Sequence, residues 1–154
     1  MIIRFKHEFG LAVGEVYSYF RTPADWTRLY GLAGDVKKLG DGWFSVPLNR
    51  FPFPLVARNT EHEENEVVRW VFRGFWRGQG EVRFTETARG VVVEGSEEIA
   101  VRWLFFLSPI IERLFLERTF HAIWEIGWSR LRKREPGGGA VACEAKNARP
   151  AEVE

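Results

Sequence analysis

The chain has 154 residues and a formal net charge of +1, with 45% hydrophobic and 15% aromatic residues. This length and apolar content fit one globular domain with a real core, and the near-neutral charge gives no sign of a nucleic-acid partner. A single cysteine, Cys143, excludes an intrachain disulfide framework and a multi-cysteine zinc site.

The start of the chain does not have the pattern of a signal peptide. The longest apolar run, from Trp103 to Ile111, is broken by Ser108-Pro109 and is shorter than the ~20 residues that a membrane span needs. We therefore expect a cytoplasmic protein without an integral membrane segment.

The first elements are a strand and two short helices. Apolar and polar residues alternate from Ile2 to Phe9, which predicts a half-buried strand. Val13, Val16 and Phe20 then recur at helical spacing, which predicts a first helix. A second helix is expected after Thr22-Pro23, because threonine is a good N-cap and proline suits the first helical position.

Short strands separated by turn residues follow over residues 35–102. Turn signals and alternating patterns predict strands at 36–39, 43–48, 55–63, 66–75, 79–87 and 91–102. Their short connections indicate an antiparallel sheet, and a sheet with one apolar face needs a cover. Phe51-Pro52-Phe53-Pro54 is expected to form a loop, because its two prolines disfavour a central strand.

A long helix is predicted from Ser108 to Arg134, and it is the element that covers the sheet. At 1.5 Å per residue it spans roughly 40 Å. On a helical wheel one sector of this helix is apolar, and it contains Leu116, Phe120, Ile123, Trp124, Gly127, Trp128 and Leu131. Gly127 inside a helix suggests that another backbone approaches there, from the first helix or a sheet turn.

Residues 135–154 show no periodicity and contain several glycines and small residues. We interpret them as a flexible tail after a single domain at 1–134, with Cys143 as an exposed thiol that has no partner for chemistry.

Taken together, a strand, two short helices, an antiparallel sheet and one long final helix resemble the helix-grip order of the START-like (SRPBCC) superfamily. The stretch from Val16 to Tyr30, with an aromatic ending, Pro23, Asp25 and Trp26, is similar to a local pattern of that group. The resemblance covers about 1–134 and extends to Bet v 1-like proteins, polyketide cyclases and dehydrases, and the coenzyme-Q-binding group. It implies an α+β fold in which a curved six- to seven-stranded sheet wraps around the last helix, with a cavity for apolar or amphipathic small molecules such as lipids.

Polar residues interrupt the apolar faces at two places. Arg113, Glu117 and His121 share one stripe of the long helix at i, i+4, i+8 spacing; they form either an exposed salt-bridging stripe or the polar end of a cavity. Glu97 falls on the inner face of its strand, and a buried carboxylate is costly unless it is paired or neutralised. Glu97 is therefore a functional group, or a bulge near Gly95 turns it outward.

Three functions follow. The first is a binding or carrier domain for a hydrophobic or amphipathic molecule, a lipid, isoprenoid or polyketide-like compound, between the sheet and the last helix. The second is a cyclase or dehydratase that uses Glu97 or His121 as its acid or base. The third is a protein-partner module of the chaperone- or ribosome-associated kind, in which Trp103–Phe106 makes a transient contact with a protein or a membrane.

The candidate ligand-binding residues are Phe53, Trp70, Phe72, Phe84, Glu97, Arg113, Glu117, Phe120, His121 and Trp124. Metal-site, phosphate-loop and nucleophile-elbow motifs are absent from the sequence, so we expect no metal and no cofactor.

Overall fold

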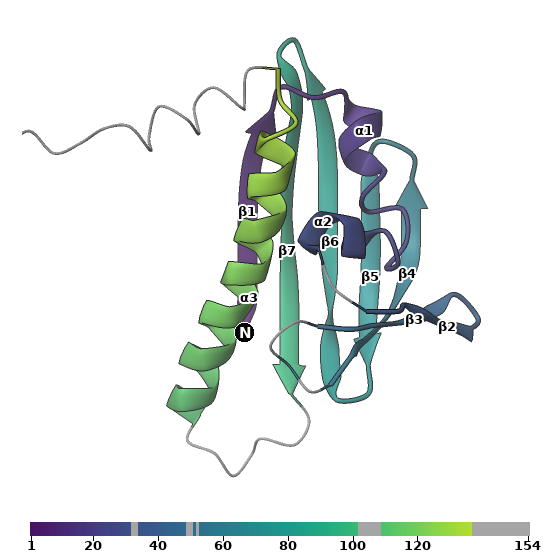
Figure 1. Ribbon diagram of the computed structural model, residues 1–154, viewed down its shortest axis with the longest axis vertical. Helices are drawn as coiled ribbons and strands as arrows, with labels where there is room; N and C mark the ends of the chain where they lie inside the picture. The colour runs from purple at the N-terminus through teal and green to yellow at the C-terminus, as the bar shows by residue number, and fades with distance from the viewer. Residues whose placement is uncertain (32–33, 49–50, 52, 102–108, 137–154) are drawn as a thin grey trace, which may run out of the picture.

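A computed structural model describes residues 1–31, 34–48, 51, 53–101 and 109–136, with the backbone alone over 109–114. In this part of the chain a seven-stranded sheet is accompanied by two short helices and one long helix (Figure 1). The elements are β1 Ile2–Phe9, α1 Val13–Tyr17, α2 Trp26–Tyr30, β2 Lys37–Gly40, β3 Trp43–Val46, β4 Leu55–Glu63, β5 Val67–Arg73, β6 Trp76–Thr87, β7 Gly90–Val101 and α3 Pro109–Arg132.

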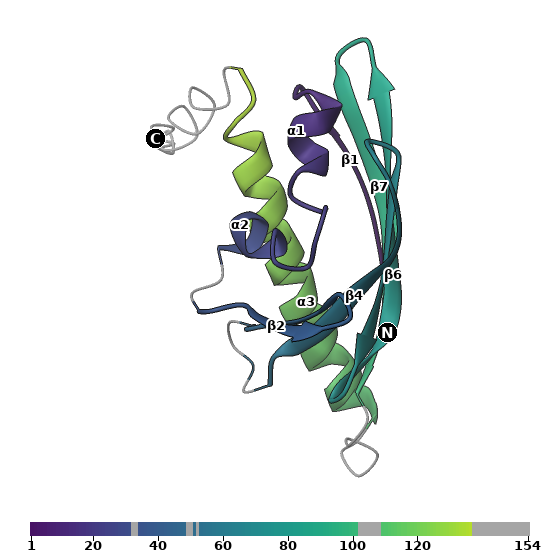
Figure 2. The ribbon, with the colours of Figure 1, turned by 90° about the vertical axis from the view of Figure 1, so that its right-hand side faces the viewer.

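All neighbouring strands are antiparallel, in the order β1-β7-β6-β5-β4-β3-β2. Strands β2 to β7 form a meander, and β1 pairs with β7 at the far edge. The three helices lie on the same side of the curved sheet, with α3 running along it (Figure 2). This is the predicted α+β helix-grip arrangement, because the sheet buries its apolar face against α3.

The α3 stripe predicted from helical spacing is confirmed. Its described residues that face the sheet are all buried: Leu116, Phe120, Ile123, Trp124, Gly127, Trp128 and Leu131. The indoles of Trp124 and Trp128 stack with ring centroids 5.0 Å apart, and Phe5 of β1 packs on both. The last helix thus closes the core with aromatic rings.

Several predicted boundaries were wrong. The second helix begins at Trp26 with Asp25 as its N-cap, and not at Thr22-Pro23. The first helix ends at Tyr17, so Phe20 lies in the turns that follow α1. The turn expected at Arg77-Gly78 lies instead at Gly74, which has a φ of 94°. Gly78 belongs to β6 opposite Ile99 of β7, where a Cβ would collide with the carbonyl of Glu98. Its glycine therefore reflects a close strand approach rather than a turn.

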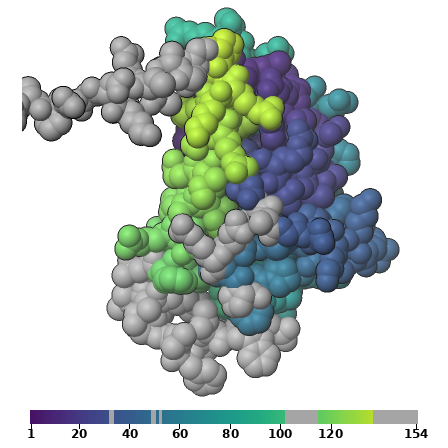
Figure 3. Space-filling model, in the orientation of Figure 1, coloured from purple at the N-terminus to yellow at the C-terminus, as the bar shows by residue number. Residues whose placement is uncertain are grey.

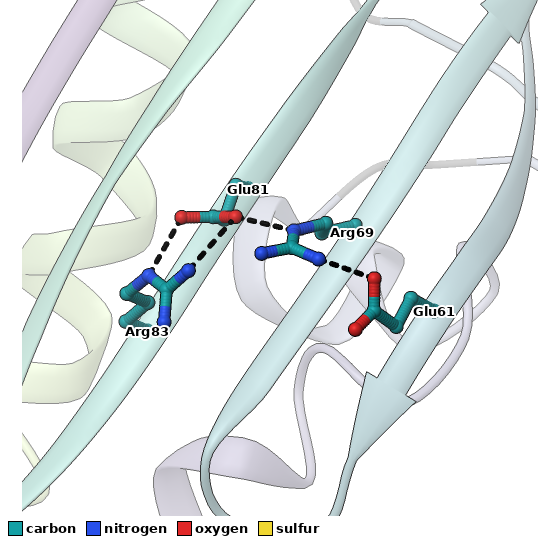
Figure 4. A network of polar contacts seen from close by, with 4 residues as sticks. All are labelled: Glu61, Arg69, Glu81 and Arg83. Carbon is teal, nitrogen blue, oxygen red and sulfur yellow. Dashed lines mark hydrogen bonds and ion pairs between the residues drawn. The ribbon is translucent and has the colours of Figure 1, made fainter.

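The opposite face of the sheet carries a lattice of charges. Arg69 of β5 stands directly between Glu61 of β4 and Glu81 of β6 and pairs with both carboxylates (Figure 4). Arg83 donates from Nε to Glu81 Oε1 at 2.7 Å. Opposite charges on facing positions stabilise the register of the sheet on its solvent side.

The residues 137–154, with Cys143, lie outside the described part of the chain, as does Trp103–Phe106. The domain boundary at 134 and the flexible tail remain predictions. Among the described residues, no helix has the length and apolarity needed to cross a membrane.

Helix α2 lies against α3 on the face seen in Figure 3, and Gly127 is the point of contact. A Cβ at Gly127 would lie 3.0 Å from Leu29 Cγ and 3.3 Å from the Tyr30 ring. The close approach inferred from this glycine is therefore made by side chains of the second helix, and not by the backbone of the first helix or a sheet turn.

We expect the substitution Gly127→Leu to lower the free energy of unfolding by about 1–3 kcal/mol, because the added side chain overpacks the contact with α2. The matched control is Ser129→Leu at an exposed position of α3, which should change stability by less than about 0.5 kcal/mol. Urea unfolding followed by circular dichroism measures both. Equal effects of the two substitutions would contradict the contact.

Candidate functional site

The site is organised around Glu97, a carboxyl group on the inner face of β7. Its side chain is 5% exposed, and the β6–β7 register continues without a shift through Gly95 and Glu97. The alternative of a bulge that turns this carboxylate outward is therefore wrong. Glu97 lies among core residues because the alternation of β7 puts it there.

Trp70 reaches Glu97 across an intervening strand. Trp70 of β5 is opposite Gly80 of β6, and Gly80 is opposite Glu97, so the three residues form one row. A Cβ at Gly80 would collide with the Trp70 indole, which shows that this ring occupies the space of the missing side chain. From there Trp70 Nε1 donates a hydrogen bond to Glu97 Oε1 at 3.4 Å.

The second partner of Glu97 comes from the helix. Trp124 of α3 donates from Nε1 to Glu97 Oε2 at 2.9 Å. Each carboxyl oxygen thus accepts one indole N–H, from the sheet on one side and from α3 on the other. The carboxyl group ties the sheet to its covering helix.

The two indoles do not fully offset the cost of burying the charge. Burial raises the pKa of the Glu97 carboxyl to about 7, while the hydrogen bonds from Trp124 and Trp70 act in the opposite direction. Burial, followed by the charge of Glu97, also raises the pKa of the Tyr30 phenol well above its ordinary value. Glu97 can therefore change its protonation state near neutral pH, a property that suits a general acid or base.

A small cavity of about 20 Å³ lies beside this carboxyl group. Its lining residues come from α2, α3, the sheet and the segment before β4: Trp26, Tyr30, Leu48, Leu55, Trp70, Glu97, Phe120, Ile123 and Trp124. The volume accommodates one group of the size of a water molecule. At this site the space between the sheet and α3 is thus nearly filled by aromatic and aliphatic side chains.

Trp26 gives the cavity an unsatisfied donor. Its side chain is 3% exposed, and its Nε1 atom is buried with no acceptor in the described part of the chain. Its ring packs edge-to-face against Trp70 at 5.3 Å between centroids. Buried polar atoms without a partner are uncommon, so an orphan N–H beside a cavity indicates a place for a guest atom.

Four of the predicted site residues line this cavity: Trp70, Glu97, Phe120 and Trp124. Phe72 and Phe84 are buried in the core outside its lining. Phe53 is 45% exposed and stacks on Phe75, with ring centroids 4.1 Å apart.

The two described side chains of the polar stripe of α3 do not line this cavity. His121 is exposed, and Glu117 is half-buried outside the cavity lining. The side chain of Arg113 lies outside the described part of the chain. His121 therefore does not line the cavity beside Glu97, because it falls on the solvent side of the helical wheel.

Sequence reasoning missed Trp26 and Tyr30 as site residues. Both lie on α2, which has only five residues, so the helix gives too little periodicity to decide which side chains face inward. Trp26 did stand in the pattern that carried the family resemblance. In the described residues no three His, Cys, Asp or Glu side chains come together as a metal site.

Searches against protein-family models and against curated proteins found no match. Solved structures do match the fold. A conserved protein from Geobacillus kaustophilus has a TM-score of 0.65 at 9% identity, over 88% of this chain and 98% of that one. A Deinococcus radiodurans protein has a TM-score of 0.59 at 17% identity, again over 88% and 98%.

A third similar structure is the Aha1 dimer from Colwellia psychrerythraea, with a TM-score of 0.61 at 10% identity over 90% of this chain and 98% of that one. At these identities the likeness establishes the shared architecture of a sheet and a C-terminal helix. It carries no information on activity.

The pH dependence of stability tests the raised pKa of Glu97. Its folded-state pKa of about 7 lies above the ordinary value of 4.5, so the unfolded chain loses this proton first as the pH rises. Glu97 therefore makes the fold progressively less stable from about pH 4.5 to about pH 7, by about 3 kcal/mol in all.

We expect the variant Glu97→Gln to lack this loss, so that its stability relative to the wild type rises by about 2–3 kcal/mol between about pH 5 and pH 8. The variant is also expected to lose stability by a constant amount at every pH, because the amide NH₂ cannot accept a hydrogen bond from the indole that it faces. The control Glu98→Gln, on the exposed face of β7, should follow the wild type. Urea titrations at several pH values measure this, and parallel curves for wild type and Glu97→Gln would refute the raised pKa.

The space left by the missing side chain of Gly80, which we call the slot, gives a second prediction. Gly80→Ala should push the Trp70 indole away from Glu97 and cost about 1–3 kcal/mol of stability. The ¹⁵N-indole NMR signal of Trp70 should move with it. The neighbouring exposed substitution Gln79→Ala should leave that signal in place; an unchanged Trp70 signal in Gly80→Ala would show that the indole does not use the slot.

Proposed function

We propose that this chain is a START-like binding domain for a small apolar or amphipathic molecule, with the polar group of the ligand at Glu97. The observation that carries the proposal is the buried Glu97 carboxyl, held by two indoles beside a cavity whose other walls are aromatic and aliphatic. A few polar groups inside an apolar pocket are typical of small-molecule sites.

The closed state of the cavity restricts how a ligand enters. A cavity of about 20 Å³ holds only the polar group, so the body of the ligand has to displace part of the wall. Trp70 and Trp124 are fixed by their hydrogen bonds to Glu97. Leu48, Leu55 and Ile123 can contribute only packing contacts, so an apolar ligand replaces their contacts at little cost. We infer that the aliphatic wall moves.

A neutral apolar fluorophore, N-phenyl-1-naphthylamine, tests this directly. The wild type should bind it saturably, and Leu55→Ala should bind it about tenfold more tightly, because the space is then already open and less wall has to move. This variant is expected to lose about 2–5 kcal/mol of stability, so its fold is checked by circular dichroism.

The matched control is Val71→Ala in β5, which lies in an open groove of about 420 Å³ on the charged face of the sheet. It should bind the fluorophore as the wild type does. No saturable binding by the wild type, or equal tightening in both variants, would overturn the proposal. Native mass spectrometry of the purified protein adds an independent search for a bound apolar compound.

The water-sized cavity favours one second candidate, a protein-partner module. Phe115 of α3 is 61% exposed, and Phe53 is 45% exposed. A similar fold occurs in the Aha1 dimer. In this alternative the aromatic side chains contact a partner, and Phe115→Ser abolishes that contact while Leu55→Ala leaves it intact. The segment Trp103–Phe106 remains part of this hypothesis.

A further inference from the structure

Donors outnumber acceptors among the polar side chains that line the cavity, which are three indoles, one carboxyl group and the Tyr30 phenol, a group that can both donate and accept. Trp26, Trp70 and Trp124 each bring an indole N–H, which can only donate. Glu97 supplies the acceptors for Trp70 and Trp124, whereas Trp26 Nε1 has none in the described part of the chain. A guest atom in this cavity meets a donor that needs an acceptor and a carboxyl group that, when ionised, accepts further hydrogen bonds.

Three polar groups of different chemistry can be compared with this inventory. A ketone oxygen accepts from Trp26 but is repelled by an ionised Glu97. An ammonium group donates to Glu97 but leaves Trp26 without an acceptor. A hydroxyl group both accepts and donates, so it satisfies Trp26 and Glu97 at the same time. A bond from a hydroxyl to an ionised carboxylate is also stronger than a neutral one.

No cationic side chain lines the cavity in the described part of the chain, and Tyr30 is the other titratable group there. Glu97 thus has no counter-ion among the described side chains that would fix its charge. A hydroxyl fits either state of the carboxyl group, because its oxygen accepts from a protonated Glu97 and its proton is donated to an ionised one.

We propose that the cavity beside Glu97 selects apolar ligands whose polar group is a hydroxyl, which accepts from Trp26 and donates to Glu97. This selectivity rests on the proposed binding function and assigns the chemical class of its ligand. The cavity volume agrees with it, since a hydroxyl group and a water molecule need nearly the same space.

The experiment uses four probes with the same ten-carbon chain: decane, 1-decanol, 2-decanone and decylammonium. Each is titrated into wild type and Trp26→Phe at a pH below and a pH above 7, with ¹⁵N-indole NMR signals as the readout. Decane corrects for the space that the smaller phenylalanine ring opens, so the change in the decanol-to-decane ratio isolates the hydrogen bond.

We expect the decanol-to-decane affinity ratio to fall about fivefold in Trp26→Phe, the size of one ordinary hydrogen bond. In the control Trp43→Phe, which removes an indole outside the cavity, the ratio should stay constant. Decanol should keep its affinity within about twofold on both sides of pH 7. Decanone should bind more weakly above pH 7, where Glu97 is ionised, and decylammonium should bind more weakly below pH 7, where Glu97 is neutral. In the wild type decanol should shift the Trp26 indole signal, which decane does not.

The outcomes distinguish a failure of the apolar binding function from a failure of the hydroxyl selectivity. If decane and the three other probes all fail to bind, the apolar binding function itself is wrong. If decane binds but the decanol ratio is the same in Trp26→Phe and wild type, the binding function stands and the hydroxyl selectivity is wrong. If Trp26→Phe does not fold, the Trp26 signal decides: no shift with saturating decanol refutes the proposal.

Discussion

The cost of burying one carboxyl group shapes the interior of this protein. Glu97 lies where the alternation of β7 requires an inward side chain, and each of its oxygens accepts an indole N–H. Such a group needs partners of fixed geometry, because an unsatisfied polar atom in the core is expensive. The partners come from β5 and α3, so the position of the helix over the sheet depends on the same three side chains.

The two faces of the sheet stabilise their carboxyl groups in different ways. On the solvent face Arg69 stands between two carboxylates, which are paired and hydrated (Figure 4). On the inner face the partners of Glu97 in the described part of the chain are two neutral indoles. Burial without a cationic partner in this part of the chain raises the pKa of Glu97 to about 7, whereas the hydrogen bond from Arg69 lowers the pKa of Glu81.

Periodicity predicted much of this arrangement. Alternation over β7 predicted that Glu97 faces inward, and helical spacing predicted the buried stripe of α3, because both depend only on local backbone geometry. Gly78 misled the strand assignment, since a glycine looks the same in a turn and at a close strand contact. The family resemblance implied a ligand cavity, but the volume of the cavity depends on how rings from α2, β5 and α3 pack together, which no local sequence pattern records.

The candidate site was predictable in its centre and not in its surroundings. Trp70, Phe120 and Trp124 followed from their apolar faces. Trp26 and Tyr30 did not, because α2 is too short to show an inner side. His121 lies within one helical turn of Trp124, yet a rotation of the helix by a fraction of a turn separates a buried position from an exposed one.

The row from Trp70 through Gly80 to Glu97 also restricts how such a sheet can evolve. One indole fills the volume of two side chains, its own and the one that position 80 lacks. A larger residue at 80 either displaces the Trp70 indole or requires a smaller residue at 70, and either change removes a donor from Glu97. We therefore expect substitutions at positions 70, 80 and 97 to occur together. The residue at 97 is then coupled to Gly80, although the two side chains share no hydrogen bond.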